Sequence, residues 1–151
     1  AELVAWNKGK GCMAYQGWKG QAVRMEHDWN GEAIGIIPDV MLRRIRGFGN
    51  GQLWKLIVLH AVDRSKAPEA GDKLISGKHN SWSMGCLVDY TTCSICLSDK
   101  PSCQHLRKDQ NIAEYNGVLA FRQVHGIVAE ESSMVDDPAF GQALGEMVIR
   151  Y

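Results

Sequence analysis

Cysteine placement constrains this chain more than any other feature of its sequence. Four of the five cysteines fall within eighteen residues, and a histidine lies two positions beyond the last of them: Cys86, Cys93, Cys96, Cys103 and His105. Clustered thiols of this kind hold a metal ion, carry out thiol–disulfide exchange or form disulfide bonds. The sequence leaves these three alternatives open, and each predicts a different local structure.

A metal site is the leading interpretation of the cluster. The spacing Cys93-x2-Cys96 lets two thiolates converge on one ion, because a tight turn brings their sulfur atoms close together. Three residues compete for the remaining positions: Cys103, His105 and Cys86. Zinc is the expected ion because it suits mixed sulfur and nitrogen ligands in a tetrahedral arrangement. The sequence therefore predicts a small soluble binding domain organised around a Cys/His zinc site.

The same stretch locally resembles thioredoxin-like proteins. The run from Leu87 to Cys96 is typical of a strand that leads into a Cys-x-x-Cys pair, and Pro101 lies five residues beyond. The resemblance implies a thiol–disulfide oxidoreductase in which Cys93 attacks and Cys96 resolves. It also implies that Cys93 is exposed at the start of a helix beginning near Ser94, where the helix dipole favours the thiolate.

Disulfide bonds in a secreted protein are the third alternative. An odd number of cysteines leaves at least one thiol free or bound to another chain. In a secreted protein we expect Cys12 to bond with a member of the cluster, which ties the N-terminal region to the centre of the chain. The sequence has no Asn-x-Ser/Thr acceptor for N-glycosylation, which slightly favours the cytoplasm over secretion.

Composition predicts an ordered globular chain. Hydrophobic residues make up 45% and charged residues 23% of the sequence, which differs from the composition of disordered segments. Seventeen basic residues balance seventeen acidic ones, so the chain lacks the positive excess that is typical of nucleic-acid binding. No stretch approaches the about 20 consecutive apolar residues that a membrane span requires.

Charge is unevenly distributed along the chain. Residues 1–55 carry eight Lys or Arg against five Asp or Glu, whereas residues 109–151 carry two Arg against seven acidic residues. Such a division is typical of a solvated surface. It would also align subunits head to tail in a homo-oligomer, which is the one partner that the sequence indicates.

The whole chain, residues 1–151, is expected to form a single compact α+β domain with a mostly antiparallel sheet. The clearest helix pattern lies at the C-terminus, over residues 139–150. Asp137 is a suitable N-cap and Pro138 suits the first helical position, while the apolar stripe comprises Phe140, Leu144, Met147 and Val148. We expect this amphipathic helix to pack on one face of the sheet.

Several segments have the hydrophobic pattern of strands. Residues 52–62 form a dense apolar run that predicts a strand or a buried helix. Residues 87–92 predict a strand, and residues 118–128 predict a strand that is interrupted at Gly126. Within the apolar run, His60 is expected to be a hydrogen-bonded core histidine rather than a catalytic base.

Two further segments are assigned from turn and cap residues. Residues 38–47 predict a short helix, with proline near its start and Gly47 at its end. Residues 66–72 predict a loop, because this short stretch carries both Pro68 and Gly71.

Overall fold

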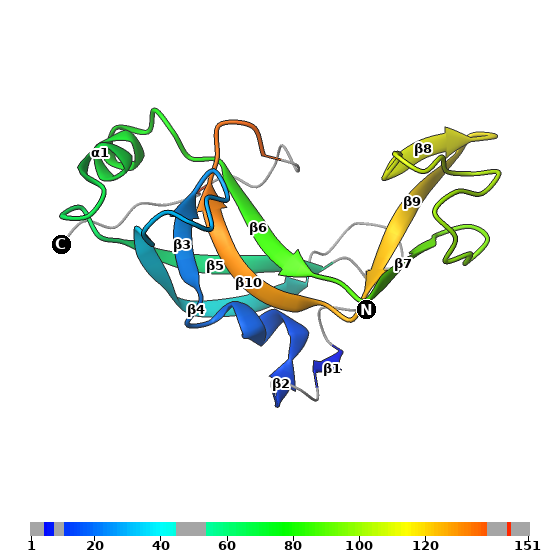
Figure 1. Ribbon diagram of the computed structural model, residues 1–151, viewed down its shortest axis with the longest axis horizontal. Coiled ribbons are helices and arrows are strands. Elements are labelled where there is room, and N and C mark those ends of the chain that lie inside the picture. Colours follow the sequence, from blue (N-terminus) through cyan, green and yellow to red (C-terminus); the bar gives the residue numbers. More distant parts are fainter. Residues whose placement is uncertain (1–4, 8–10, 45–53, 139–144, 146–151) are drawn as a thin grey trace.

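The computed structural model describes residues 5–7, 11–44, 54–138 and 145 of the chain. Within these ranges the protein is mostly sheet with one short α-helix (Figure 1). The elements follow one another in this order: β1 (Trp6–Asn7), β2 (Cys12–Met13), the 3-10 helix η2 (Ala14–Trp18), β3 (Ala22–Met25), β4 (Gly35–Arg44), β5 (Trp54–Val62), α1 (Pro68–Ser76), β6 (Trp82–Leu87), β7 (Tyr90–Cys93), β8 (Ile112–Tyr115), β9 (Val118–His125) and β10 (Val128–Met134).

Five strands form the larger sheet, in the order β5-β4-β3-β10-β6. Strands β3 and β10 are parallel, while the other neighbouring pairs are antiparallel, so the sheet is mixed. The sheet curls until its two edge strands approach each other. His60 on β5 stacks on Trp82 of β6 with ring centroids 3.9 Å apart, although these strands stand at opposite ends of the sheet.

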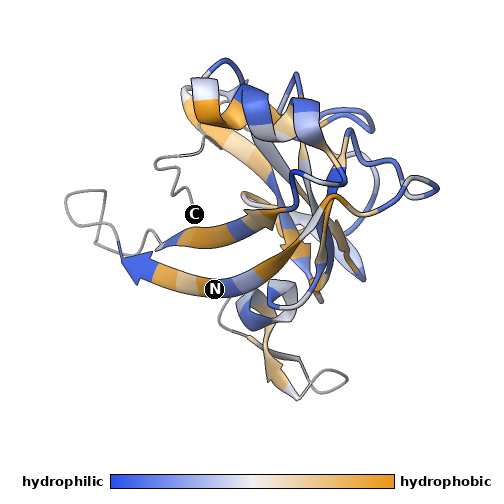
Figure 2. Ribbon diagram, turned by 90° about the vertical axis from the view of Figure 1, so that its left-hand side faces the viewer, coloured by the Kyte–Doolittle hydropathy of each residue, from blue (hydrophilic) through white to orange (hydrophobic). Residues whose placement is uncertain are grey.

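The larger hydrophobic core belongs to this curled sheet. Its most deeply buried side chains include Trp18, Val23, Ile37 and Met134. Trp18 comes from η2, and its indole N–H donates to the carbonyl of Glu131 at 3.2 Å. Figure 2 shows hydrophobic residues concentrated along the strands and hydrophilic residues in the connecting loops. Each fully buried aliphatic side chain contributes about 1.5–3 kcal/mol, which makes this core the main source of stability.

A smaller antiparallel sheet lies apart from the larger one (Figure 1), with the strand order β7-β9-β8. Asn116 and Gly117 have φ angles of 51° and 75° and form the two-residue turn between β8 and β9. Gly126 has a φ of 67° between β9 and β10, so the interruption predicted there is confirmed. Residues 94–111, between β7 and β8, contain no regular helix or strand.

Two other segments with a predicted strand pattern also form strands, with bounds that differ from the prediction. The apolar run over residues 52–62 is a strand and not a buried helix, because β5 occupies it from Trp54 onward. The strand predicted over residues 87–92 is divided between two strands, since β6 ends at Leu87 and β7 begins at Tyr90. Between these two strands the chain leaves the larger sheet and enters the smaller one.

The short helix predicted over residues 38–47 is wrong, because its described part belongs to β4. Val40 and Leu42 are half-buried while Met41 is 57% exposed, which is the two-residue alternation of a strand. Strand β4 hydrogen-bonds to β3 on one side and to β5 on the other, so pairing with distant strands overrides the local helix pattern. The rest of the predicted helix lies outside the described residues.

The loop predicted over residues 66–72 is also wrong, because α1 begins at Pro68 and ends at Ser76. Proline is tolerated in the first helical turn, where its missing N–H breaks no helical hydrogen bond. Gly77 follows the helix with a φ of 69°, and its N–H donates to the carbonyl of Leu74. This left-handed glycine ends the helix.

The amphipathic helix predicted over residues 139–150 lies outside the described residues, apart from Gly145. The described helix α1 is central in the sequence and not C-terminal. The structure therefore confirms a compact, mostly β chain with a helix, but does not test the C-terminal position predicted for that helix. Among the described residues, no helix is both long enough and apolar enough to cross a membrane.

Candidate metal centre

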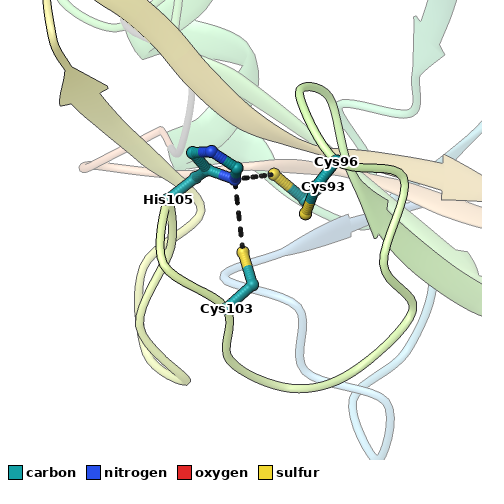
Figure 3. A group of neighbouring side chains, drawn as sticks. All are labelled: Cys93, Cys96, Cys103 and His105. Atoms are coloured by element: carbon teal, nitrogen blue, oxygen red, sulfur yellow. Dashed lines mark hydrogen bonds between the residues drawn. The ribbon is translucent and has the colours of Figure 1, made fainter.

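The first half of the candidate site is a tight turn at the end of β7. Cys93 is the last residue of β7, and residues 94–96 turn the chain so that Cys96 lies beside Cys93 (Figure 3). The Cys93 N–H donates to the Ser98 carbonyl at 3.0 Å, and the Leu97 N–H donates to the Cys93 carbonyl at 2.9 Å. These two bonds close the turn and fix the separation of the two thiols.

The second half comes from the irregular segment that follows. The Cys103 N–H donates to the Leu106 carbonyl at 2.9 Å, which makes a turn that directs Cys103 and His105 toward Cys93 (Figure 3). The Nδ1 atom of His105 lies 3.8 Å from the Cys93 Sγ atom and 3.9 Å from the Cys103 Sγ atom. One imidazole nitrogen therefore faces two sulfur atoms, one at the end of β7 and one in the irregular segment that follows.

The four potential ligand atoms match the dimensions of a metal site. The three Sγ atoms and one histidine nitrogen all lie within 4.8 Å of one another. A tetrahedral zinc ion, with Zn–S bonds of about 2.3 Å and Zn–N bonds of about 2.0 Å, separates its ligand atoms by about 3.5–3.8 Å. Only a small contraction of the observed cluster is needed. The fold thus forms a Cys3His cluster within metal-binding distance.

The backbone of the turn favours a thiolate at Cys93. The backbone N–H of Cys96 contributes most to lowering the pKa of Cys93 to about 6; burial opposes this, and the N–H of Ile95 adds to it. For Cys96, the backbone N–H of Ser98 favours the thiolate, but burial and the neighbouring Cys103 and Cys93 sulfur atoms raise its pKa. Crowded thiols resist ionising together, and a bound cation would remove that repulsion.

The imidazole of His105 is held in place by its surroundings. His105 is only 7% exposed, and its ring packs edge-on against Tyr115 with centroids 4.5 Å apart and an interplanar angle of 86°. Its Nε2 atom lies 3.2 Å from the side-chain amide of Gln104. A metal bound at Nδ1 would leave the ring proton on Nε2, so the Gln104 amide would have to present its oxygen in place of its nitrogen to accept that proton.

Arg122 on β9 connects the irregular segment to the sheet through hydrogen bonds. Its guanidinium donates to the carbonyls of Lys100 and Arg107, each at 3.2 Å, and also to the carbonyl of Pro101. These carbonyls lie on both sides of the two ligands in the segment. Arg122 also pairs with Cys93 in the β7–β9 register, so one residue connects both halves of the site.

The core around the site is very small. Its buried hydrophobic members are Cys93, Leu106 and Ala120, with Cys103 and Ala113 partly buried beside them. Two of these five side chains belong to the candidate ligands themselves. Apolar burial therefore supplies little of the energy needed to order the long segment between β7 and β8.

Four of the five ligands proposed from the sequence lie together, and the fifth does not. Cys86 is exposed on β6, where it pairs with Ala129 of β10 in the larger sheet, and it is not part of the cluster. Cys12 lies on β2, also outside the cluster. All five cysteines are within the described residues and each is a free thiol, so the expected bond from Cys12 is not formed.

The structural expectations of the thioredoxin-like resemblance are wrong. No helix begins near Ser94, because residues 94–96 form a turn. Cys93 has no exposed surface, whereas the attacking thiol of an oxidoreductase must be accessible. The lowered pKa of Cys93 therefore belongs to a closed cluster and not to an accessible nucleophile.

Sequence reasoning missed a second group of polar residues, on β10. Glu131, Ser132 and Ser133 are fully buried in consecutive positions of this strand. Three polar residues in a row, inside a strand that follows Gly126, were the available sign. Their partners, His27 and His60, lie too far away in the sequence for any local pattern to reveal them.

Fold and site together define a mostly β chain with a Cys3His cluster within metal-binding distance. Comparisons of this chain with protein-family models, with curated proteins and with solved structures found no match.

Proposed function

We propose that this chain is a zinc-binding domain in which one Zn²⁺ ion stabilises the smaller sheet. The ligands would be Cys93, Cys96, Cys103 and His105. The observation that supports the proposal most is that their four ligand atoms lie within 4.8 Å of one another. Protein side chains would fill all four tetrahedral positions, which is typical of a structural zinc site and leaves no open position for a substrate.

The need for a stabilising ion follows from the architecture of the smaller sheet. Residues 94–111 have no regular secondary structure, and the core of the smaller sheet has only three buried hydrophobic side chains, one of which belongs to this segment. Ordering the backbone costs about 1–2 kcal/mol per residue, so this segment requires a stabilising contribution beyond apolar burial. Zinc binding to a small domain contributes about 10–16 kcal/mol at pH 7, which would offset a large part of this cost.

The chemistry of the ligands favours zinc over other ions. Thiolates and an imidazole at tetrahedral separations suit zinc, whereas calcium and magnesium require oxygen ligands. The backbone N–H groups that face the Cys93 sulfur would also stabilise a metal-bound thiolate.

Metal analysis of matched variants tests the proposal. We expect the purified protein to contain about one zinc ion per chain, and X-ray absorption at the zinc edge to show three sulfur neighbours and one nitrogen neighbour. Cys103→Ser should lose the bound zinc, because it removes a ligand from the loop. Cys86→Ser is the matched control and should keep it, since Cys86 lies outside the cluster. Equal zinc loss in both variants, or a metal-free wild-type protein, would contradict the proposal.

A further inference from the structure

The members of the Cys3His cluster differ in how far solvent reaches them. Cys93 has no exposed surface, and His105 is only 7% exposed. Cys103 is half-buried, whereas Cys96 is exposed. Leu97, the next residue along the turn, is 68% exposed, so this end of the turn lies at the protein surface. Cys96 is therefore the thiol of the cluster that a reagent in solution meets first.

A cavity gives solvent a second route to the cluster. Its volume is about 320 Å³, and the residues that line it include Cys103, His105 and Tyr115. A water molecule takes up about 30 Å³ of the liquid, so a molecule of the size of hydrogen peroxide has ample room in this cavity. Small oxidants therefore reach the surroundings of both Cys96 and Cys103 without any opening of the fold.

The exposed thiol has a buried thiol beside it on the same turn. The Sγ atoms of Cys96 and Cys93 are at most 4.8 Å apart, and Figure 3 shows the two side chains next to each other. The hydrogen bond from the Leu97 N–H to the Cys93 carbonyl closes the turn that holds them. A disulfide places sulfur atoms about 2.05 Å apart, so the two atoms need to approach by less than about 3 Å.

We propose that hydrogen peroxide oxidises Cys96 and Cys93 to a disulfide and so releases the zinc ion; this inference rests on the proposed zinc site. In the first step the Cys96 sulfur bonds to one peroxide oxygen, the O–O bond breaks, and the leaving oxygen takes a proton from solvent to become water. The Cys93 sulfur then bonds to the Cys96 sulfur, the S–O bond breaks, and the hydroxide leaves as water with a second proton. Two thiolates lose two electrons, and peroxide is reduced to two water molecules.

Disulfide formation changes the smaller sheet because it removes two of the four ligands. Cys103 and His105 alone do not complete a tetrahedral zinc site. Both belong to the irregular segment, which has little apolar burial of its own, so this segment loses its order together with the ion. The core of the larger sheet contains no ligand of the cluster and stays folded. The oxidation state of one turn thus controls the order of one sheet.

Zinc release and peptide mapping of the full-length, zinc-loaded protein test this switch. Cleavage before Asp89 and Asp99 isolates residues 89–98, a peptide that contains Cys93 and Cys96 and no other cysteine. We expect a modest excess of hydrogen peroxide to release the zinc to a chromophoric chelator and to make this peptide lighter by two hydrogen atoms. A thiol reductant followed by added zinc should reverse both changes.

Two variants identify the thiol that peroxide attacks. Cys96→His keeps four ligands, now two thiolates and two imidazoles, but lacks the exposed thiol of the cluster. Its zinc should be released at least about 10-fold more slowly, because susceptibility to oxidation follows exposure. Cys86→Ser is the matched control, since it removes an exposed thiol that lies outside the cluster, and it should release zinc at the wild-type rate.

The outcomes separate the switch from the zinc site on which it rests. A wild-type protein that keeps its zinc in peroxide for hours would overturn the switch and leave the zinc site in place. A wild-type protein without zinc before peroxide is added would overturn both. Equal release from Cys96→His and the wild-type protein, or a disulfide that joins residues 89–98 to the peptide with Cys103, would overturn the assigned pair. If Cys96→His binds no zinc, the mapping of the wild-type disulfide still decides.

Discussion

His60 links the stability of the fold to pH. Burial lowers its pKa from 6.5 to about 4, so the unfolded chain takes up a proton at a higher pH than the folded chain does. The free energy of unfolding should therefore fall as the pH drops from 6.5 toward 4. Above pH 6.5 the stabilisation that comes from keeping His60 neutral is fully present. The loss amounts to at most about 3 kcal/mol, because each pKa unit corresponds to about 1.4 kcal/mol.

Urea unfolding at neutral pH and near pH 4 measures this effect. His60→Gln keeps a hydrogen-bonding side chain opposite Ser132 but cannot titrate, so its stability should depend less on pH than that of the wild-type protein. The comparison isolates His60 from the other histidines, since both proteins retain them. Parallel pH profiles for the two proteins would show that His60 does not titrate as its burial requires.

At the level of residues, the sequence predicted four members of one Cys3His cluster but not the buried polar partners in the larger sheet. Cys93 and Cys96 were predictable because two residues between thiols place both on one turn. Cys86 could not be excluded, because its exclusion depends on the pairing of β6 with β10, far along the chain. The contact between His60 and Ser132 joins residues 72 positions apart, and no local pattern encodes it.

At the scale of elements, Arg122 shows how a strand supports the Cys3His cluster. Its guanidinium donates to three carbonyls of the segment that carries Cys103 and His105. Arg122→Ala should free that segment and weaken zinc binding about 10- to 100-fold, as the loss of an outer-shell contact usually does. Competition with a chromophoric chelator measures the affinity directly.

Arg107→Ala is the matched control for this prediction. It also removes one arginine charge near the cluster, here from the irregular segment, but the Arg107 side chain is exposed and only its carbonyl meets Arg122. Zinc affinity should therefore stay near the wild-type value. Equal weakening in the two variants would mean that charge, and not the bonds from Arg122, sets the affinity.

Local turn chemistry explains which elements could be predicted. Asn116-Gly117 forms the β8–β9 turn and is a strong hairpin signal, although no turn was predicted there. Pro68 and Gly77 mark the two ends of α1, although the short spacing of Pro68 and Gly71 suggested a loop. Strand β4 was not predictable, because its two sheet neighbours decide its conformation.

The molecule as a whole has two cores of unequal size. The larger sheet buries an extensive apolar cluster that includes Trp18, Ile37 and Met134, whereas the smaller sheet buries three hydrophobic residues. We therefore expect the larger sheet to remain folded without a metal ion, whereas the smaller sheet should depend on an ion held by the Cys3His cluster. Removal of the metal should then act on one part of the chain only.

Amide hydrogen exchange with and without a strong zinc chelator measures this difference between the two sheets. Chelation should increase exchange in β7, β8 and β9 by several orders of magnitude, because local opening then costs little free energy. Exchange in β3, β4 and β10 should change little, since their core contains no ligand of the cluster. Unchanged exchange in β7, β8 and β9 after complete zinc removal, or equal loss of protection in both sheets, would show that the smaller sheet does not depend on the metal.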